Sequence, residues 1–292
     1  MAAALRWALN GTVVKVIQES GGMSSLRLVE IRNTLAFAGL AVAIALVRPS
    51  LLRVAWRELP FLIAFGIAGL ALVQWLYLVA VARMPIGIAL IVEYVGIVFV
   101  ALWARFVYRE PVRRRVWVAL LLAIAGLALV VEVWSGLELD GVGLTASIAA
   151  AFVLALYFLM AEHEVGKRDP VSLICYGFFF GTLFWAAVQP WWSFPFGLLD
   201  DSGSLLGNLA DVELPVWALV AYMVVLGTIV PFGLMVGALR HISATRAGIV
   251  AMLEPVAASV VAFAWLDESL GAAQLLGGGV VLGGILLAQT AR

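Results

Sequence analysis

Long apolar stretches alternate with short polar connections along the whole chain. A helix needs about 20 apolar residues to cross roughly 30 Å of hydrocarbon, and most of these stretches have that length. Breaker residues such as Pro49, Pro60, Pro170, Pro215 and Gly271 stand in the connections. The pattern predicts an all-α integral membrane protein with ten transmembrane helices, over residues 2–18, 29–47, 59–80, 86–108, 114–133, 142–161, 172–191, 215–239, 247–266 and 272–290.

The first predicted helix is the shortest. Arg6 and Lys15 interrupt its apolar stretch and no small-residue cleavage site follows, so it does not read as a cleavable signal peptide. Two interpretations are open: a short first span, or a helix that is clipped because the true start lies upstream. Nine or eleven spans are the alternatives to ten, and the charge bias described below favours ten.

One segment of the chain returns in a second copy. YLVAVARMPIGIALIVE at 77–93 reappears as ALRHISATRAGIVAMLE at 238–254, an offset of 161 residues because 77 + 161 = 238. The matched pairs include Leu78 with Leu239, Gly87 with Gly248, Glu93 with Glu254 and, after a slip of three residues, Gly126 with Gly284. Duplicated membrane halves that meet near the midplane are typical of secondary transporters.

The repeat divides the chain into two halves, residues 1–135 and 136–292, with five predicted helices in each. An odd number of helices forces the two copies to cross the membrane in opposite senses. We therefore expect two inverted five-helix repeats that abut in one membrane domain.

Basic residues set the expected orientation. With the N-terminus inside, the inner side holds twelve Lys and Arg residues and the outer loops hold two, Arg27 and Arg83. The inner residues are Arg48, Arg53, Arg57, Arg109, Arg113, Arg114, Arg115, Lys167, Arg168, Arg240, Arg246 and Arg292. The positive-inside rule then places both termini in the cytoplasm and the long connection 192–214 outside the cell membrane.

Composition limits the partners and cofactors. The chain is 64% hydrophobic and 12% charged, so its solvent must be lipid. The formal net charge of zero argues against nucleic acid as a partner. The single Cys175 excludes an internal disulfide and a cysteine cluster, and His163 and His241 sit beside charged loop segments. We expect no metal or other cofactor.

Glu93 and Glu254 are the leading site candidates, because each interrupts an apolar run at the same repeat position. A carboxylate at the bilayer centre is costly unless it faces a cavity or a partner. The pair could bind a substrate ammonium group, exchange a proton, or both. The alternative is that each carboxyl is buried as the neutral acid and bonds to a neighbouring helix.

Pro255 follows Glu254 and frees a backbone carbonyl about one turn earlier, which either lines a cavity or marks a packing kink. Its repeat partner is Tyr94, so the two halves differ chemically here.

The remaining polar candidates lie at membrane depth: Asn10, Gln74, Trp75 and Tyr77. Aromatic residues more often face lipid or pack than line a cavity. We expect Lys15 to reach the outer interface, and Arg32 to do the same or to pair with its neighbours Glu30 and Asn33.

The last helix is rich in glycine. Gly279 and Gly283 have the spacing that lets helices approach closely, and they fit either a homodimer face or an internal contact.

Enzyme signatures such as GxxxxGK[ST], HExxH and GxSxG are absent from the sequence. A transporter is favoured over an intramembrane enzyme acting on a lipid-linked substrate, which would need clustered catalytic groups. A membrane sensor or scaffold without transport is the third alternative.

The second-half motif ISATRAGIVAMLEPVAASVVAFAWLDESLGAAQLLGGGVVLGGILLAQ at 242–289 resembles the EamA branch of the drug/metabolite transporter superfamily. ARMPIGIALIVEYVG at 82–96 is similar to the threonine/homoserine-exporter type, although Gly96 is followed by Ile97 where that type usually has Gly-Pro. The resemblance implies ten helices in two inverted EamA repeats, a central cavity, and movement of small polar metabolites or amino acids, often outward. We expect proton-coupled export of a zwitterionic or cationic substrate.

Overall fold

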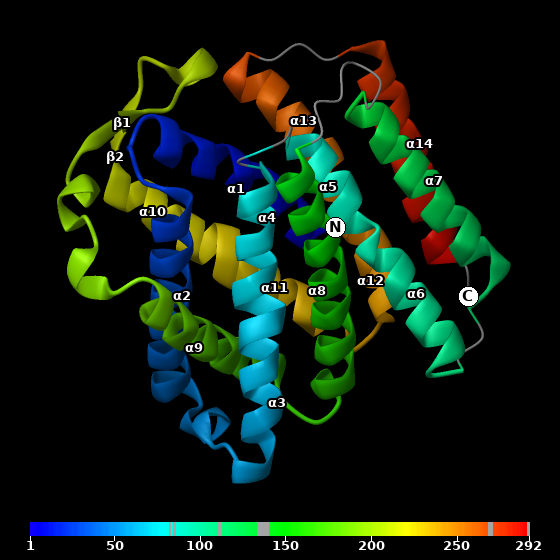
Figure 1. Ribbon diagram of the computed structural model, residues 1–292, viewed down its shortest axis with the longest axis horizontal. Helices are drawn as coiled ribbons and strands as arrows, with labels where there is room; N and C mark the ends of the chain where they lie inside the picture. Colours follow the sequence, from blue (N-terminus) through cyan, green and yellow to red (C-terminus); the bar gives the residue numbers. More distant parts are fainter. Residues whose placement is uncertain (82, 84–85, 110–111, 133–139, 268–270, 291–292) are drawn as a thin grey trace.

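The computed structural model describes residues 1–81, 83, 86–109, 112–132, 140–267 and 271–290. The expected boundary between the halves at 135/136 and the basic Arg292 lie outside these described residues. The chain is mostly helical, as Figure 1 shows, and its one described sheet is a small antiparallel pair of strands in a loop.

The helices of the first half follow the predicted spans closely. They are α1 (Ala2–Glu19), α2 (Ser25–Val47), α3 (Leu59–Ala64) continuing through the π-helical segment η3 (Phe65–Leu72) into α4 (Val73–Val81), α5 (Ile86–Tyr94), α6 (Gly96–Phe106) and α7 (Arg114–Val130). The predicted helix 86–108 is therefore two helices, with a break at Val95 that an unbroken apolar run does not signal.

The second half has the same order of elements. Its helices are α8 (Gly141–Val165), α9 (Pro170–Val188), α10 (Val216–Val224) with the π-helical η7 (Val225–Ile229) and α11 (Val230–Ala238), α12 (Ala244–Ala251), α13 (Leu253–Leu266) and α14 (Ala272–Thr290). The predicted helix 247–266 starts earlier, at Ala244, and breaks at Met252.

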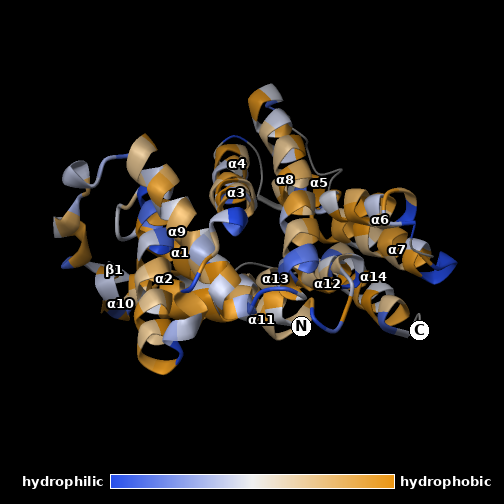
Figure 2. Cartoon of the chain, turned by 90° about the horizontal axis from the view of Figure 1, so that it is seen from below, coloured by the Kyte–Doolittle hydropathy of each residue, from blue (hydrophilic) through white to orange (hydrophobic). Residues whose placement is uncertain are grey.

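Eight helical stretches in the described part of the chain are long and apolar enough to cross a membrane. The helices α1 and α7 are not among these eight, although they have 18 and 17 residues. Large apolar side chains remain exposed on the spans, for example Leu46 at 80%, Leu121 at 68% and Leu286 at 62%. Figure 2 shows hydrophobic residues along the helices and hydrophilic ones mainly at their ends and in loops. Such an apolar exterior suits a lipid environment.

Polar residues at helix starts explain where several helices begin. The side chain of Asp140 accepts a hydrogen bond from the backbone nitrogen of Gly143 at 2.7 Å and caps α8. Asp169 caps α9 in the same way, bonding to Val171, and Pro170 occupies the first turn, where no backbone donor is needed.

The two π-helical segments stand at nearly equivalent repeat positions. Phe65, the first residue of η3, maps to 226 with the offset of 161, and η7 begins at Val225. A π-helical turn is rare and often lies at a functional site. Its occurrence in the third span of both halves adds a structural likeness to the sequence repeat.

The helices α2 and α9 run antiparallel and are joined at both ends. At the start of α2, Nη2 of Arg27 bonds to Oγ of Ser193, just after α9 ends. At the start of α9, Nη2 of Arg168 bonds to the carbonyl oxygen of Arg53, just after α2 ends, at 3.0 Å. An arginine at or just before the start of each helix thus holds the connection that follows the other helix.

The helices α7 and α14 pack side by side along their length, as Figure 1 shows at the right of the view. A Cβ atom on Gly277 would lie 2.6 Å from the carbonyl oxygen of Gly126 on α7, so the close approach requires glycine there. Around Gly279 and Gly283 nothing lies within 4 Å of an added Cβ. The internal contact therefore runs through Gly277, and the spaced pair Gly279 and Gly283 faces away from it.

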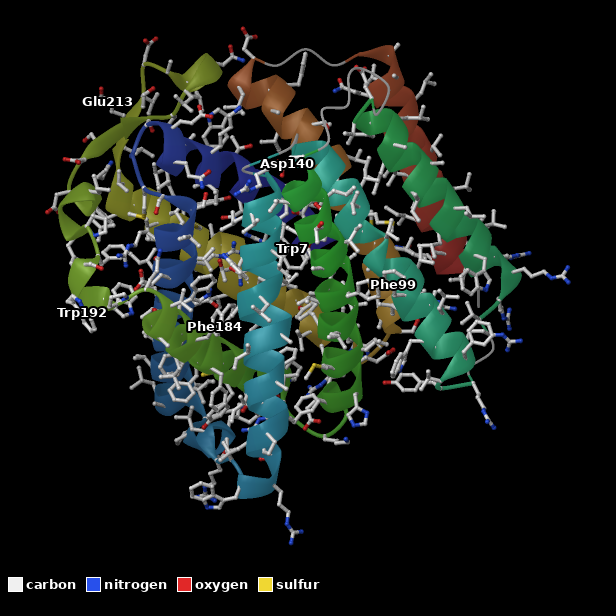
Figure 3. The ribbon with its side chains drawn as sticks, viewed as in Figure 1. Trp7, Phe99, Asp140, Phe184, Trp192 and Glu213 are labelled. Carbon is white, nitrogen blue, oxygen red and sulfur yellow. The ribbon has the colours of Figure 1, made fainter. Side chains whose placement is uncertain are left out.

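The long connection between α9 and α10 carries the strands β1 (Ser202–Ser204) and β2 (Glu213–Pro215) and packs against α13. Nε1 of Trp265 donates to the carbonyl oxygen of Leu205 at 2.8 Å, and the amide of Asn208 bonds to the carbonyl of Ala264. Figure 3 labels Glu213 and Asp140 toward the same end of the molecule.

Candidate functional site

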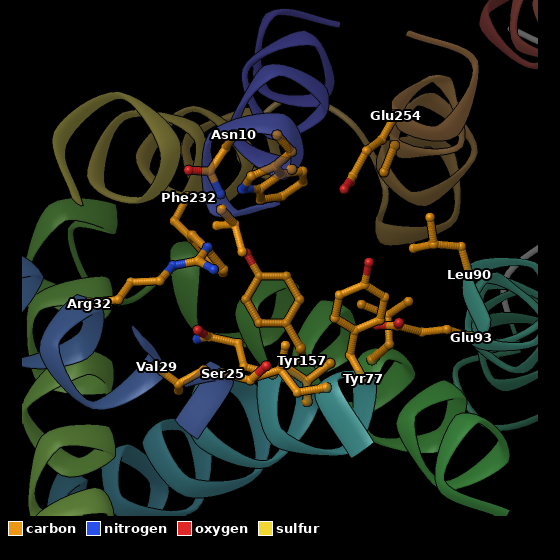
Figure 4. A pocket seen from close by; sticks show the side chains of 18 of the residues that line it. Asn10, Ser25, Val29, Arg32, Tyr77, Leu90, Glu93, Tyr157, Phe232 and Glu254 are labelled. Atoms are coloured by element: carbon orange, nitrogen blue, oxygen red, sulfur yellow. The ribbon is translucent and has the colours of Figure 1, made fainter. Parts of the chain in front are cut away.

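A cavity of about 400 Å³ lies among α1, α2, the η3–α4 helix, α5, α8, α11, α12 and α13, so both halves contribute to it. It reaches the end of the bundle where α1 ends and α2 begins, because Gln18, Glu19 and Ser25 belong to its wall. Its other polar lining residues are Asn10, Lys15, Arg32, Gln74, Tyr77, Glu93, Tyr94, Tyr157 and Glu254. Figure 4 shows Glu93 and Glu254 on one side of the cavity and Arg32 on the other.

Glu254 is held at the break between α12 and α13. The hydroxyl of Tyr94 lies 2.9 Å from Oε2 of Glu254 and 3.1 Å from the carbonyl oxygen of Ala251. Pro255 has no backbone N–H, so it leaves that Ala251 carbonyl without its helical donor. Tyr94, the repeat partner of Pro255, therefore reaches across the two halves to the carbonyl that Pro255 frees.

Glu93 lines the cavity near the end of α5, just before the break at Val95. Its side chain is buried, with 8% of the residue exposed. The two glutamates thus stand beside two helix breaks, one in each half, although Glu93 precedes its break and Glu254 follows its own.

Arg32 has a different environment from the one expected. Its Nε donates to Oγ1 of Thr228 at 2.7 Å, across to the π-helical segment η7. The neighbouring Glu30 pairs instead with Arg27, at 2.6 Å, and the amide of Asn33 bonds to the carbonyl of Val29. Arg32 neither pairs locally nor reaches an interface. The expectation was wrong because Thr228, which is 196 positions away, supplies the acceptor.

Two amides in the wall keep an oxygen without a donor. Nε2 of Gln74 donates to the carbonyl of Leu70 at 2.7 Å, while its Oε1 is buried without a hydrogen bond among the described residues. Oδ1 of Asn10 and the hydroxyl of Tyr157 are also buried without a hydrogen bond among the described residues. Buried polar atoms usually have a partner, so unpaired ones in a cavity wall suit a polar ligand or water.

Six of the eight predicted site residues meet at this cavity: Asn10, Gln74, Tyr77, Glu93, Tyr94 and Glu254. Pro255 is buried behind the wall, and Trp75 does not line the cavity and is 38% exposed. Lys15 also lines the cavity, and its reach to the outer interface stays a prediction. Sequence reasoning missed Arg32, Tyr157 and Thr228 as site residues. The signal that could have found them is a hydroxyl or a charged group inside an apolar run.

Chemically, the cavity combines carboxyl groups on one wall with a guanidinium on the other. Such a pairing can hold a ligand that carries both an amine and an acid, and a carboxyl group can also exchange a proton. Within the described residues no cluster of three or more His, Cys, Asp or Glu side chains could hold a metal ion.

Comparison with known proteins also indicates a membrane transporter. A family model described as "EamA-like transporter family" matches residues 1–132 and 141–290. The chain is 27% identical to "Threonine/homoserine exporter RhtA" of Escherichia coli (strain K12), over 84% of this chain and 76% of that protein. It is 25% identical to a "Probable terminal-alkyne amino-acid exporter" of Streptantibioticus cattleyicolor, over 96% and 89%.

A third relative, an "Uncharacterized transporter" of Archaeoglobus fulgidus, is 28% identical over 75% of this chain and 74% of its own. A solved structure described only as "Crystal structure of protein" superposes with a TM-score of 0.74 at 18% identity, covering 98% of this chain and 94% of that one. At that identity the likeness concerns the fold alone.

Proposed function

Because the chain belongs to the EamA-like transporter family, we propose that it is a secondary transporter that moves small polar metabolites or amino acids by alternating access. It is a multi-pass membrane protein, and two of its relatives carry the name exporter. The observation that carries the proposal is the cavity shared by both halves, with Glu93 and Glu254 in its wall. Export is the proposed direction.

The proposed architecture is ten transmembrane helices in two inverted repeats, 1–135 and 136–292. Three pairs of equivalent helices support it: α2 with α9, the α5–α6 pair with α12–α13, and α7 with α14 all pack together. The reciprocal arginine contacts at the two ends of α2 and α9 suit a pseudo-two-fold axis in the membrane plane. The helices α1 and α7 complete the ten.

The proposed location is the cell membrane, with both termini in the cytoplasm. The excess of Lys and Arg on one side supports this orientation. In that orientation the end of α1 and the loop with β1 and β2 are outside, and the cavity reaches the outer end. The described conformation would then be the one from which an exporter releases its substrate.

Proton exchange at the glutamates is the proposed coupling. A buried glutamate without an ion pair at bonding distance is most stable as the neutral acid in a dry wall. A substrate ammonium group that arrives beside it favours the ionised form, so the proton leaves as the substrate binds. On the other side of the membrane the substrate would leave as a proton binds, and the protonated carrier would then return. Alternating access thus couples substrate movement one way to proton movement the other way.

Transport by purified protein in liposomes tests the proposal. The liposomes are loaded with labelled amino acids, and efflux is followed with and without an imposed pH gradient. Loaded liposomes without the protein are the control. We expect efflux that quickens when protons are supplied on the opposite side. Equal flux after the gradient is collapsed would identify a facilitator or exchanger. Chemically altered substrate would point to an enzyme, and no flux for any substrate would point to a sensor or scaffold.

A further inference from the structure

Among the described residues, no carboxylate lies at bonding distance from the guanidinium of Arg32. The nearest acidic neighbour in sequence, Glu30, already pairs with Arg27. Among the described residues Arg32 bonds to Thr228 alone, through Nε, so its two terminal nitrogens keep their hydrogens free at the cavity. A buried charge without an ion pair at bonding distance is costly, and such groups in membrane proteins usually mark a ligand path.

Thr228 fixes the direction in which this guanidinium points. The hydroxyl of Thr228 donates its only hydrogen to the carbonyl oxygen of Met223 at 2.8 Å. It can therefore only accept from Arg32, and it binds Nε rather than a terminal nitrogen. The residue itself is fully buried in η7. This arrangement presents the terminal edge of a planar donor group to the cavity.

A second polar group lies beside this edge. Asn10 is 5% exposed and lines the cavity, and the NH2 of its amide is a hydrogen-bond donor. Its amide oxygen packs against Gly227, next to Thr228, where an added Cβ atom would overlap that oxygen. Figure 4 shows the amide of Asn10 and the guanidinium of Arg32 on the same side of the cavity.

We propose that Arg32, positioned by Thr228 and assisted by Asn10, is the subsite that binds the carboxylate group of the transported substrate. The planar fork of an arginine matches the two oxygens of a carboxylate, and the Asn10 amide can donate a further hydrogen bond. The opposite wall, with Glu93 and Glu254, then receives the amine end. This inference rests on the proposed transport function and narrows its substrate to acids.

Binding to the purified protein in detergent tests the subsite without requiring transport. Each of the twenty common amino acids is compared with its own carboxamide, which keeps the amine and side chain but lacks the negative charge. Stabilisation against heat gives the affinity for each compound. The wild-type protein should bind at least one amino acid about tenfold to a hundredfold more tightly than its carboxamide, as expected for loss of a charged hydrogen bond.

The variants assign this preference to residues. Arg32→Gln should abolish the difference between acid and carboxamide, and Arg32→Lys should retain part of it. Thr228→Val, which keeps the shape, should weaken acid binding severalfold, while Thr228→Ser should restore it. Arg105→Gln, an exposed arginine on α6, is the control for loss of a positive charge and should leave the preference unchanged.

Three outcomes would overturn the subsite. They are equal binding of acids and carboxamides by the wild type, no binding of any of them, or an acid preference that survives in Arg32→Gln. A protein that prefers acids through Arg32 but moves none of them across liposomes would retain the subsite and lose the transport proposal. The two failures are therefore distinguishable.

Discussion

The phenolic oxygen of Tyr94 lies between two acceptors, Oε2 of Glu254 at 2.9 Å and the carbonyl oxygen of Ala251 at 3.1 Å. A phenol has one hydrogen, so it donates to one of them at a time. When it donates to Ala251, a bond to Glu254 requires a protonated carboxyl as the donor. When Glu254 is ionised, the stronger charge-assisted bond draws the phenol hydrogen to the carboxylate. The proton on Glu254 thus decides how the break between α12 and α13 is bonded.

Removal of the Tyr94 hydroxyl should cost stability. In Tyr94→Phe the carbonyl of Ala251 keeps no donor from either Pro255 or the phenol, and leaving such a group unpaired costs about 1–3 kcal/mol. Tyr157→Phe is the matched control, because that hydroxyl is buried in the same cavity without a partner. Heat denaturation in detergent should show a lower midpoint for Tyr94→Phe alone. Equal midpoints would mean that the Tyr94 bonds contribute nothing to stability.

Glu254→Gln should impair transport more than Glu93→Gln. Glu254 has the Tyr94 contact and lies beside the backbone carbonyl that Pro255 frees, whereas the described residues around Glu93 show no such arrangement. Glutamine keeps the size of the side chain and removes the exchangeable carboxyl proton. Initial efflux rates from liposomes, normalised to the amount of inserted protein, measure the effect. Wild-type rates in both variants would remove the two glutamates from the mechanism.

Arg168 should stabilise the junction between the halves. Its side chain is 7% exposed and bonds to Glu58 at 2.9 Å, to the carbonyl of Arg53 and to Ser172. Arg168→Gln should lower the free energy of unfolding by about 2 kcal/mol or more, since Glu58, the Arg53 carbonyl and the buried Ser172 hydroxyl lose a charged donor. Lys167→Gln, next to it but 59% exposed in its side chain, should have an effect below about 1 kcal/mol. Heat denaturation of the two variants compares them directly, and a similar loss in both would contradict the assignment.

The glycine contact between α7 and α14 gives a prediction with a control on the same helix. Gly277→Leu places atoms where the backbone of α7 lies and should destabilise the protein by about 1–3 kcal/mol or prevent folding. Gly279→Leu meets open space and should remain close to wild type in heat stability. If instead Gly279→Leu changes the size of the particle in detergent, it supports the homodimer face, which stays a prediction.

Labelling of introduced cysteines should place the loop with β1 and β2 outside the cell. In a Cys175→Ser background, Asp211→Cys should react with an impermeant maleimide in intact cells, while Lys167→Cys should react only after the membrane is opened. Both positions are exposed to solvent in the structure, so access reports sidedness. The reversed pattern would invert the proposed topology.

Apolar length predicted where the helices lie, because crossing hydrocarbon fixes that length regardless of tertiary contacts. The prediction 59–80 and the observed helix from Leu59 to Val81 differ by one residue. The break at Val95 and the π-helical segments were not predicted, since they interrupt no hydrophobic pattern, whereas Pro255 had signalled a kink as one alternative near the break at Met252. They depend on packing between helices that are far apart in the sequence.

For the same reason, only part of the candidate site could be predicted from the sequence. Glu93 and Glu254 were found from the repeat because a carboxyl inside an apolar run is visible without a structure. The contact between Arg32 and Thr228 joins residues 196 positions apart, and neither residue has a repeat signal. No local spacing rule links them. That Arg32 faces Thr228 and the cavity, and neither snorkels nor pairs locally, therefore required the folded chain.

Tyr94 and Pro255 occupy the same place in the two copies, since 94 + 161 = 255. In a carrier with identical inverted halves, a two-fold rotation would relate the inward-open and outward-open forms, and this symmetry would make them equal in free energy. Here one copy supplies the phenol and the other supplies the carbonyl that it binds, so no symmetry imposes that equality. The resting population can favour one orientation even without substrate or a gradient.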